Sequence, residues 1–203
     1  MTLVDHFMSV SAKSDLAVPP KRKVFGRISI VTGNVIQVAG IVGACVSLIA
    51  ARTAPRSPLA AASMLAAWLL LYFFAHGIAH WFVGRLLGIR FRFYTVGGTG
   101  NPEGYPPGLR WFFEHLPFFG VQTEKASMES ASGAARALMW SAGVSSSAIV
   151  PTLSALVAWR WQVLGSGPFL VFAVVWGLAT LASNWTSRSG DFAKARRALG
   201  GER

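Results

Sequence analysis

Long apolar stretches dominate the chain, and short polar or proline-bearing segments separate them. Four stretches approach or exceed the roughly 20 residues that a helix needs to cross a bilayer. They predict helices at about residues 28–51, 59–87, 134–159 and 168–184. The sequence therefore predicts an all-α polytopic membrane protein with about four transmembrane helices, which form a single membrane domain over residues 28–184.

The segment between the second and third predicted helices has a different pattern. Residues 90–130 are rich in glycine, proline and aromatic residues, and Arg90–Val96 begins with alternating polar and apolar positions. Such alternation is typical of a β-strand. We therefore expect a short hairpin here, together with a loop that lies on the membrane surface or re-enters the membrane.

Polar, basic segments flank the predicted membrane domain. Residues 1–27 include a Pro-Pro pair and end in a basic cluster, which predicts a mostly flexible cytoplasmic tail. The apolar run after it is longer than the roughly 7–15 apolar residues of a signal peptide, so we interpret it as a retained first helix. Residues 185–203 form a basic C-terminal tail, in which we expect a short amphipathic helix.

The charge balance supports a membrane location. Only 13% of the residues are charged, against roughly 25% in an ordinary soluble domain. The net charge is +11, yet the two turns between the first and second and between the third and fourth helices hold only Arg52, Arg56 and Arg160. This asymmetry predicts an inner or plasma membrane of bacterial type with both termini cytoplasmic. The lipid bilayer is then the expected partner, and the pattern does not fit a nucleic-acid-binding surface.

Two histidines, His76 and His80, lie four residues apart near the end of the second predicted helix. Residues so spaced share one helical face, about 6 Å apart along the axis. Two imidazoles in this arrangement can ligate zinc together with a carboxylate, which leaves one position for water. A histidine within a membrane helix is costly and indicates function by default, but the pair alone also fits hydrogen bonds to backbone or water.

Asp191 is the candidate for a third metal ligand. The chain has three aspartates, and the other two, Asp5 and Asp15, lie in the N-terminal tail. Asp191 follows the fourth predicted helix, on the same predicted side of the membrane as the two histidines. The alternative role for Asp191 is that of a surface carboxylate that caps the helix after it.

Three stretches occur in the order "AHGIAHWFVGRLLGIRFRFYTVGG", "ARALMWSAGVSSSAIV" and "SNWTSRSGDFAKARRAL" over roughly residues 59–199. Together they resemble the site-2 protease family of intramembrane zinc metalloproteases. The first is similar to that family's H-E-x-x-H helix and following strand, and the last to its asparagine-to-aspartate segment. The resemblance implies zinc bound by His76, His80 and Asp191. It also implies substrate binding by Asn184, for which a helix cap or a hydrogen bond within the bundle is an equal alternative.

The chain departs from this family at the catalytic position. Gly77 stands where the family has the glutamate that acts as general base, and Phe192 follows Asp191 where the family usually has glycine. Loss of a general base typically slows a reaction roughly 10²–10⁴-fold. We therefore expect a zinc-binding protein whose peptidase activity is lost or strongly reduced, and whose groove binds transmembrane helices of substrates or partner proteins.

Two alternatives remain open from the sequence. The first is an active intramembrane protease with a different general base, for which the loop region offers Glu103, Glu114, Glu124 and Glu129. The second is a metal-free membrane scaffold or accessory subunit. Whether the protein is an enzyme is thus undecided at this level.

Overall fold

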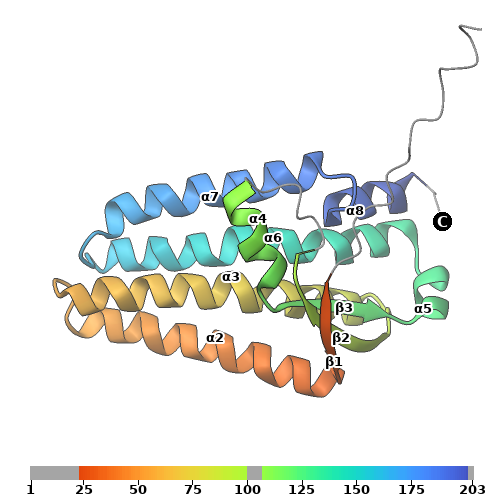
Figure 1. Cartoon of the computed structure of the whole chain (residues 1–203), viewed down its shortest axis with the longest axis horizontal. Coiled ribbons are helices and arrows are strands. Elements are labelled where there is room, and N and C mark those ends of the chain that lie inside the picture. The colour runs from red at the N-terminus through yellow and green to blue at the C-terminus, as the bar shows by residue number, and fades with distance from the viewer. Residues whose placement is uncertain (1–22, 100–106, 201–203) are drawn as a thin grey trace, which may run out of the picture.

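Four long helices lie side by side, and a small sheet covers one end of them (Figure 1). The computed structural model describes residues 23–99 and 107–200. The long helices are α2 (Ile30–Thr53), α3 (Pro58–Leu86), α6 (Gly133–Arg160) and α7 (Ser166–Thr186). Each is long and apolar enough to cross a membrane. The four predicted helices are confirmed, with bounds that differ from the expected ones by no more than two residues at either end.

Three of the long helices begin at a serine. The hydroxyls of Ser29, Ser57 and Ser132 accept hydrogen bonds from backbone N–H groups three residues further on. A serine at this position satisfies one of the N–H groups that a helix start leaves unpaired. Pro58 occupies the first turn of α3, where its missing N–H costs nothing. These caps set the starts of the helices inside otherwise continuous apolar sequence.

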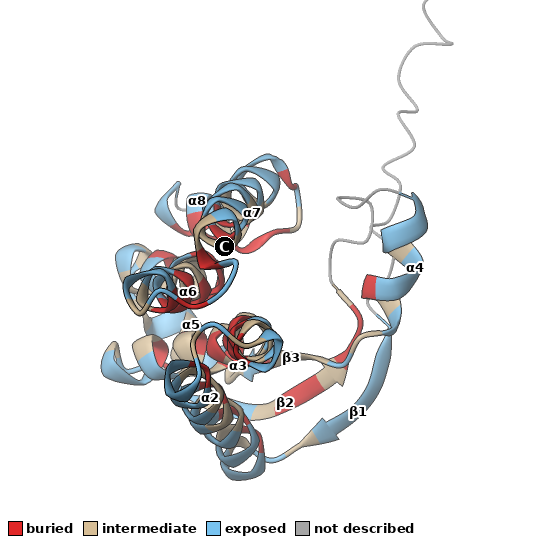
Figure 2. Cartoon of the chain, turned by 90° about the vertical axis from the view of Figure 1, so that its left-hand side faces the viewer, coloured by how far each residue is buried: buried red, intermediate tan, exposed pale blue. Residues whose placement is uncertain are grey.

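Small residues carry the contacts between the helices. Ala51, Ala60 and Ala158 are buried in one cluster, and Ala155 and Ala173 are buried in another. Close approach of backbones at small residues is how helices pack in a membrane, where burial of apolar surface from lipid gains little. The outer faces of α2 and α7 are instead exposed (Figure 2), and valine is the commonest of their exposed large apolar residues. A bilayer is the environment that suits such faces.

The sheet has three antiparallel strands in the order β1 (Val24–Ile28), β2 (Phe91–Gly97) and β3 (Phe118–Thr123). The central strand confirms the strand predicted from Arg90. The assignment of residues 24–27 to a flexible tail is wrong, because these residues pair with the edge of β2. Their side chains are mostly exposed, so backbone hydrogen bonds hold β1, and an apolar pattern does not reveal it.

Three shorter helices complete the described chain: α4 (Pro107–His115), α5 (Lys125–Ser130) and α8 (Asp191–Leu199). The last one confirms the amphipathic helix expected in the C-terminal tail. It packs against α6 and α7 at the end of the bundle that also carries the sheet (Figure 1). α4 stands apart from the long helices, at the far side of the sheet (Figure 2).

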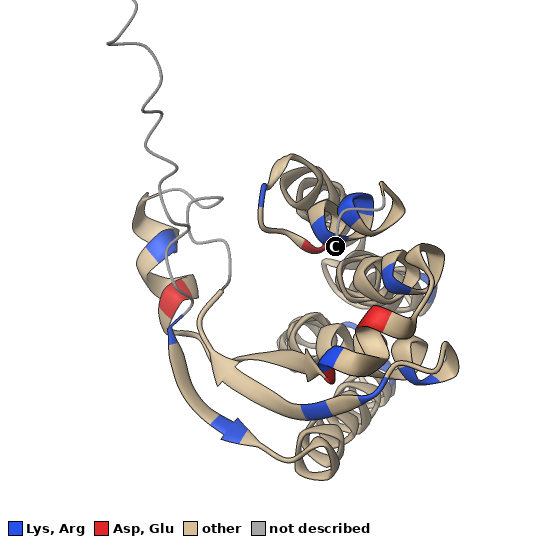
Figure 3. Ribbon diagram, turned by 90° about the vertical axis from the view of Figure 1, so that its right-hand side faces the viewer, with Lys and Arg blue, Asp and Glu red and all other residues tan. Residues whose placement is uncertain are grey.

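Basic side chains gather at the sheet end of the bundle, as seen when that end faces the viewer (Figure 3). Among the described residues, the opposite end holds Arg52, Arg56 and Arg160, which lie at or near the α2–α3 and α6–α7 connections. This distribution matches the charge count from the sequence. The cytoplasmic placement of the sheet end stays a prediction.

We predict that Tyr94→Phe destabilises the fold. Tyr94 is fully buried between β2 and α2, and its hydroxyl donates a 2.8 Å hydrogen bond to Asn34 Oδ1. Removal of the hydroxyl leaves the Asn34 acceptor without this donor, which costs about 1–2 kcal/mol. Thermal unfolding of the detergent-solubilised protein measures the loss. Asn34→Ala is the matched partner for a double-mutant cycle, and fully additive effects would contradict the coupling.

Candidate metal centre

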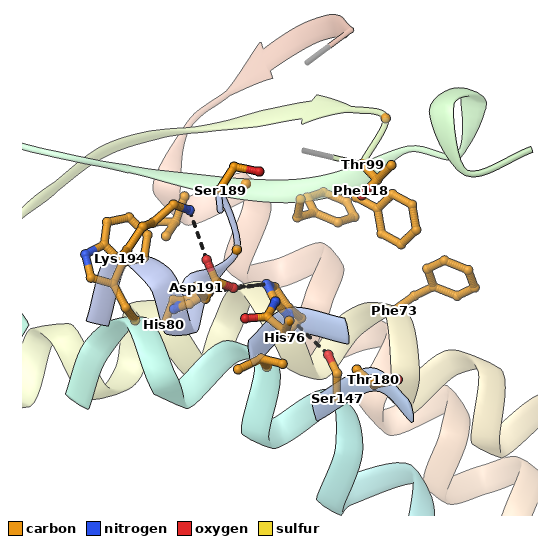
Figure 4. Close-up of a pocket in the computed structure, with 18 of the residues that line it drawn as sticks. Phe73, His76, His80, Thr99, Phe118, Ser147, Thr180, Ser189, Asp191 and Lys194 are labelled. Carbon is orange, nitrogen blue, oxygen red and sulfur yellow. Dashed lines mark hydrogen bonds and ion pairs between the residues drawn. The ribbon is translucent and has the colours of Figure 1, made fainter. Parts of the chain in front are cut away.

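The fold brings His76, His80 and Asp191 together at the sheet end of the bundle (Figure 4). His76 and His80 lie one turn apart on α3, and Asp191 is the first residue of α8. Nε2 of His80 is 3.2 Å from Nε2 of His76 and 3.2 Å from Oδ2 of Asp191. Nε2 of His76 is 3.3 Å from the same oxygen. Three donor atoms therefore form a nearly equilateral triangle.

The distances between the three donor atoms match those between the ligands of a tetrahedral metal ion. Nitrogen and oxygen ligands of a small tetrahedral ion lie about 2.0–2.1 Å from it, and therefore about 3.3–3.4 Å from one another. The observed spacings of 3.2–3.3 Å match that tetrahedral edge. The three residues could thus hold one metal ion, with a fourth position open.

Hydrogen bonds to the opposite ring nitrogens fix the direction of both imidazoles. His80 Nδ1 donates a 2.7 Å hydrogen bond to the carbonyl oxygen of Met139, and His76 Nδ1 lies 3.0 Å from the Ser147 hydroxyl. A carbonyl only accepts, so Nδ1 of His80 carries a proton, and in the neutral ring that binds a metal the lone pair is then on Nε2. Metal-binding histidines are commonly oriented in this way by a partner behind them.

Gly143 on α6 makes room for the His80 ring. A Cβ atom at position 143 would overlap three ring atoms of His80, Nε2, Cδ2 and Cε1. Next to it, the Ser146 hydroxyl donates a 3.1 Å hydrogen bond to the carbonyl of Ala75, which joins α6 to α3 beside the histidines. The glycine and the serine together let the two helices approach closely enough for the site to form.

Asp191 is buried, with 8% of its surface exposed, and its two oxygens have different partners. Oδ2 faces both histidines, while Oδ1 accepts a 2.9 Å hydrogen bond from Lys194 Nζ. Burial alone would raise the pKa of the Asp191 carboxyl. When the histidines are protonated, the charge of His80, the hydrogen bonds from His76 and His80 and the charge of Lys194 outweigh burial and hold the pKa of Asp191 well below its ordinary value. The carboxylate is therefore ionised, as a metal ligand must be.

Asn184 lies beside the His76, His80 and Asp191 group and takes part in holding α8. Its Oδ1 accepts a 2.9 Å hydrogen bond from the backbone N–H of Phe192, in the first turn of that helix. Asn184 also lines the cavity described next. The hydrogen bond within the bundle, one of the alternatives expected from the sequence, is therefore present, while Asn184 lies inside α7 and does not cap its end. A role in substrate binding stays a prediction.

A cavity of about 480 Å³ opens next to the triangle of donor atoms. α3, α6, α7, α8 and the whole of β3 contribute to its wall. Its aromatic and aliphatic lining residues are Tyr72, Phe73, Phe118, Phe119, Val121, Trp140 and Val144. Its polar side chains include Ser147, Thr180, Ser183, Ser189 and Lys194. Polar and apolar groups thus line the cavity in about equal measure.

Gly77 lies on α3 next to the first histidine, and the space beside it is occupied by Gln37. A Cβ atom at Gly77 would lie 2.5 Å from Oε1 of Gln37 and 3.3 Å from the backbone oxygen of Phe119. Gln37, on α2, is fully buried. Its Nε2 donates to the Gly33 carbonyl, and its Oε1 has no hydrogen-bond partner among the described residues. The Gln37 amide therefore occupies space that a side chain at position 77 would need.

No glutamate in the described part of the chain lines the cavity, where it could act as a general base. Glu114 pairs with Arg110 at 3.1 Å on α4, and Glu129 pairs with Lys125 at 3.7 Å on α5. Neither these two nor Glu124 lines the cavity. Glu103 lies outside the described residues. Asp191 is the one carboxylate that the described cavity wall contains.

Sequence reasoning found the three donor residues and missed the residues that orient them. Ser147, Gly143 and Lys194 belong to this group. The spacing of Gly143 and Ser147, four residues apart, places both on one face of α6, which is a signal available from the sequence. The contact of Gln37 with Gly77 has no such signal, because 40 residues of chain separate them and only the packing of α2 on α3 brings them together.

Comparison of the chain with models of protein families, with curated proteins and with solved structures finds no significant match.

We predict that Gly143→Ala removes metal binding. The added methyl group overlaps the His80 imidazole, so the ring must turn away and the triangle of donor atoms is lost. Metal content of the purified variant, measured after dialysis against limiting metal, should fall at least about tenfold. Gly108→Ala is the matched control, because a Cβ atom there meets nothing within 4 Å. Retention of metal by Gly143→Ala would contradict the packing described.

We further predict that glutamate at position 77 destabilises the protein while Gln37 is present, because the Gln37 amide must move to admit it. Gly77→Glu should lower the stability of the solubilised protein, because the new side chain collides with a buried amide. Gln37→Ala opens space, so the double variant should recover at least about 1 kcal/mol relative to additive effects. Gly108→Glu serves as the control for an added carboxylate. Additive effects of the two substitutions would show that Gln37 does not block position 77.

Proposed function

We propose that the chain is a site-2-protease-like integral membrane protein that binds zinc through His76, His80 and Asp191 and has lost most or all of its peptidase activity. The observation that carries the proposal is the triangle of donor atoms, which has tetrahedral spacing and fixed ring orientations. Gly77 stands beside it at the position of the general base in the resembling family. The proposal therefore has two parts: zinc binding by the three residues, and loss of peptidase activity because no general base stands at position 77.

Zinc is the metal that this donor set favours. Two imidazole nitrogens and one carboxylate oxygen, with one open position, are the ligands of a common type of catalytic zinc site. Magnesium and calcium prefer sites built from oxygen atoms. Buried partners behind both histidines strengthen such a site. The chemistry that zinc supplies when bound is polarisation of a ligand and a lowered pKa of bound water.

Loss of peptidase activity follows from the surroundings of position 77. A general base must lie within hydrogen-bond distance of the proton that it removes. Gly77 has no side chain, and Gln37, which fills the adjacent space, carries an amide that is neutral and cannot act as the base. Asp191 is committed to the two histidines and Lys194. Any remaining hydrolysis would be slow.

Binding without cleavage is the role that remains for the cavity. β3 is an edge strand of the sheet, and all six of its residues line the cavity. An extended peptide can pair with such an edge through backbone hydrogen bonds. The aromatic wall suits apolar side chains. We therefore propose that the cavity receives unwound transmembrane segments of substrates or partner proteins.

We predict about one zinc ion per chain in the purified protein. His76→Ala and Asp191→Ala should each reduce zinc content at least about tenfold, because each removes one ligand. Inductively coupled plasma mass spectrometry measures the metal. His115→Ala is the matched control, since this histidine lies on α4 and contacts Lys23 instead of the triangle.

A metal-free wild-type protein would contradict the zinc site and favour a scaffold. Incubation with a panel of single-span membrane proteins tests the other half of the proposal. The zinc-loaded wild type should bind such proteins and leave them intact. Efficient cleavage would show that the chain is an active protease with a base other than residue 77.

A further inference from the structure

Lys194 is the one lysine or arginine in the wall of the cavity as far as the chain is described. It lies on α8, one turn after Asp191, and 36% of its side chain is exposed. Its Nζ donates to Asp191 Oδ1 at 2.9 Å and lies 4.3 Å from the centre of the Trp140 ring. The two contacts hold the ammonium group beside the donor triangle (Figure 4).

The charge of the cavity depends on this lysine. Asp191 is the one acidic residue in the described wall, and it directs Oδ2 to the histidines and Oδ1 to Lys194. A divalent ion brings two positive charges, of which Asp191 offsets one, and Lys194 adds another. The loaded cavity therefore carries a net positive charge that no other charged residue of its described wall offsets. An anion is the ligand that compensates it, because unbalanced charge is costly in such surroundings.

We propose that the metal-loaded cavity binds a carboxylate attached to an apolar body, with one oxygen at the open metal position and the other at Lys194 Nζ. An ammonium group has three N–H donors, and Asp191 is the single hydrogen-bonding partner of Lys194 in the described chain. An N–H group of Lys194 is thus left to donate a hydrogen bond to a ligand in the cavity, which Lys194 lines. This inference rests on the metal site proposed above.

Two features favour a carboxylate over a phosphate. A carboxylate has two oxygens, which match the two attachment points of the site. Phosphate carries more charge and is typically bound by several donors, among which arginine is frequent. No arginine lines the cavity in the described residues. The apolar body is inferred from the aromatic wall, which includes Phe73, Phe118 and Phe119.

Cobalt-loaded protein provides the test, because Co²⁺ occupies similar sites and its visible spectrum reports on its ligands. The full chain in non-ionic detergent is loaded with Co²⁺ and titrated with N-acetyl-L-phenylalanine. Titration with N-acetyl-L-phenylalaninamide is the matched control, because this molecule has the same body without the charge. We expect the acid to change the spectrum and to bind at least about tenfold more tightly than the amide.

Variants of Lys194 connect this preference to the lysine. Lys194→Met retains the apolar stem and should lose most of the preference for the acid. Lys194→Arg retains the charge and should keep the preference. Lys125→Met is the control variant, because Lys125 lies on α5 with 89% of its side chain exposed. Cobalt content is measured in every variant.

The outcomes separate this inference from the metal site itself. A chain that binds no Co²⁺ overturns both. A cobalt-loaded wild type that binds acid and amide equally overturns this inference alone, as does a Lys194→Met variant that keeps the full preference. A parallel titration with octanoate identifies the source of the carboxylate. Tighter binding of octanoate indicates a fatty acid, and tighter binding of the N-acetyl amino acid indicates a peptide C-terminus.

Discussion

The contact of Asp191 Oδ2 with both histidines is the interaction on which the rest of the site depends. It joins the start of α8 to α3, which is far away in the chain. The distances from Oδ2 to the two histidine Nε2 atoms are 3.2–3.3 Å. A buried carboxylate needs partners of this kind, because burial without them would be costly. Lys194 binds the second oxygen of Asp191 and keeps the first one directed at the histidines. The same contact thus ties α8 to α3 and brings together three atoms that could ligate one metal ion.

Much of the fold could be predicted from the sequence because its main signals are local. Apolar length alone located α2, α3, α6 and α7, and the serines that cap three of them agree with the predicted starts. The sheet was harder to predict. β2 alternates visibly, whereas β1 is short and exposed and depends on backbone pairing with a strand almost 70 residues away. Pairing over such a distance leaves no pattern in either segment.

The candidate site likewise contains residues that could be predicted from the sequence and residues that could not. Histidine and aspartate are rare in this chain, so their positions alone made a metal site a reasonable hypothesis. The residues that shape the site are common ones whose role depends on tertiary packing. Gly143 matters because the His80 ring rests on it, and Gln37 matters because its amide fills the space beside Gly77. A side chain at position 77 would therefore require the Gln37 amide to move.

X-ray absorption spectroscopy of the zinc-loaded protein tests the central claim most directly. We expect a four-coordinate zinc ion with nitrogen and oxygen ligands at about 2.0–2.1 Å, two of which are imidazoles and none of which is sulfur. His115→Ala should leave this spectrum unchanged, and Asp191→Ala should alter it. A six-coordinate ion surrounded by oxygen atoms, or a spectrum without two imidazoles, would contradict the assignment of His76, His80 and Asp191 as a single metal centre.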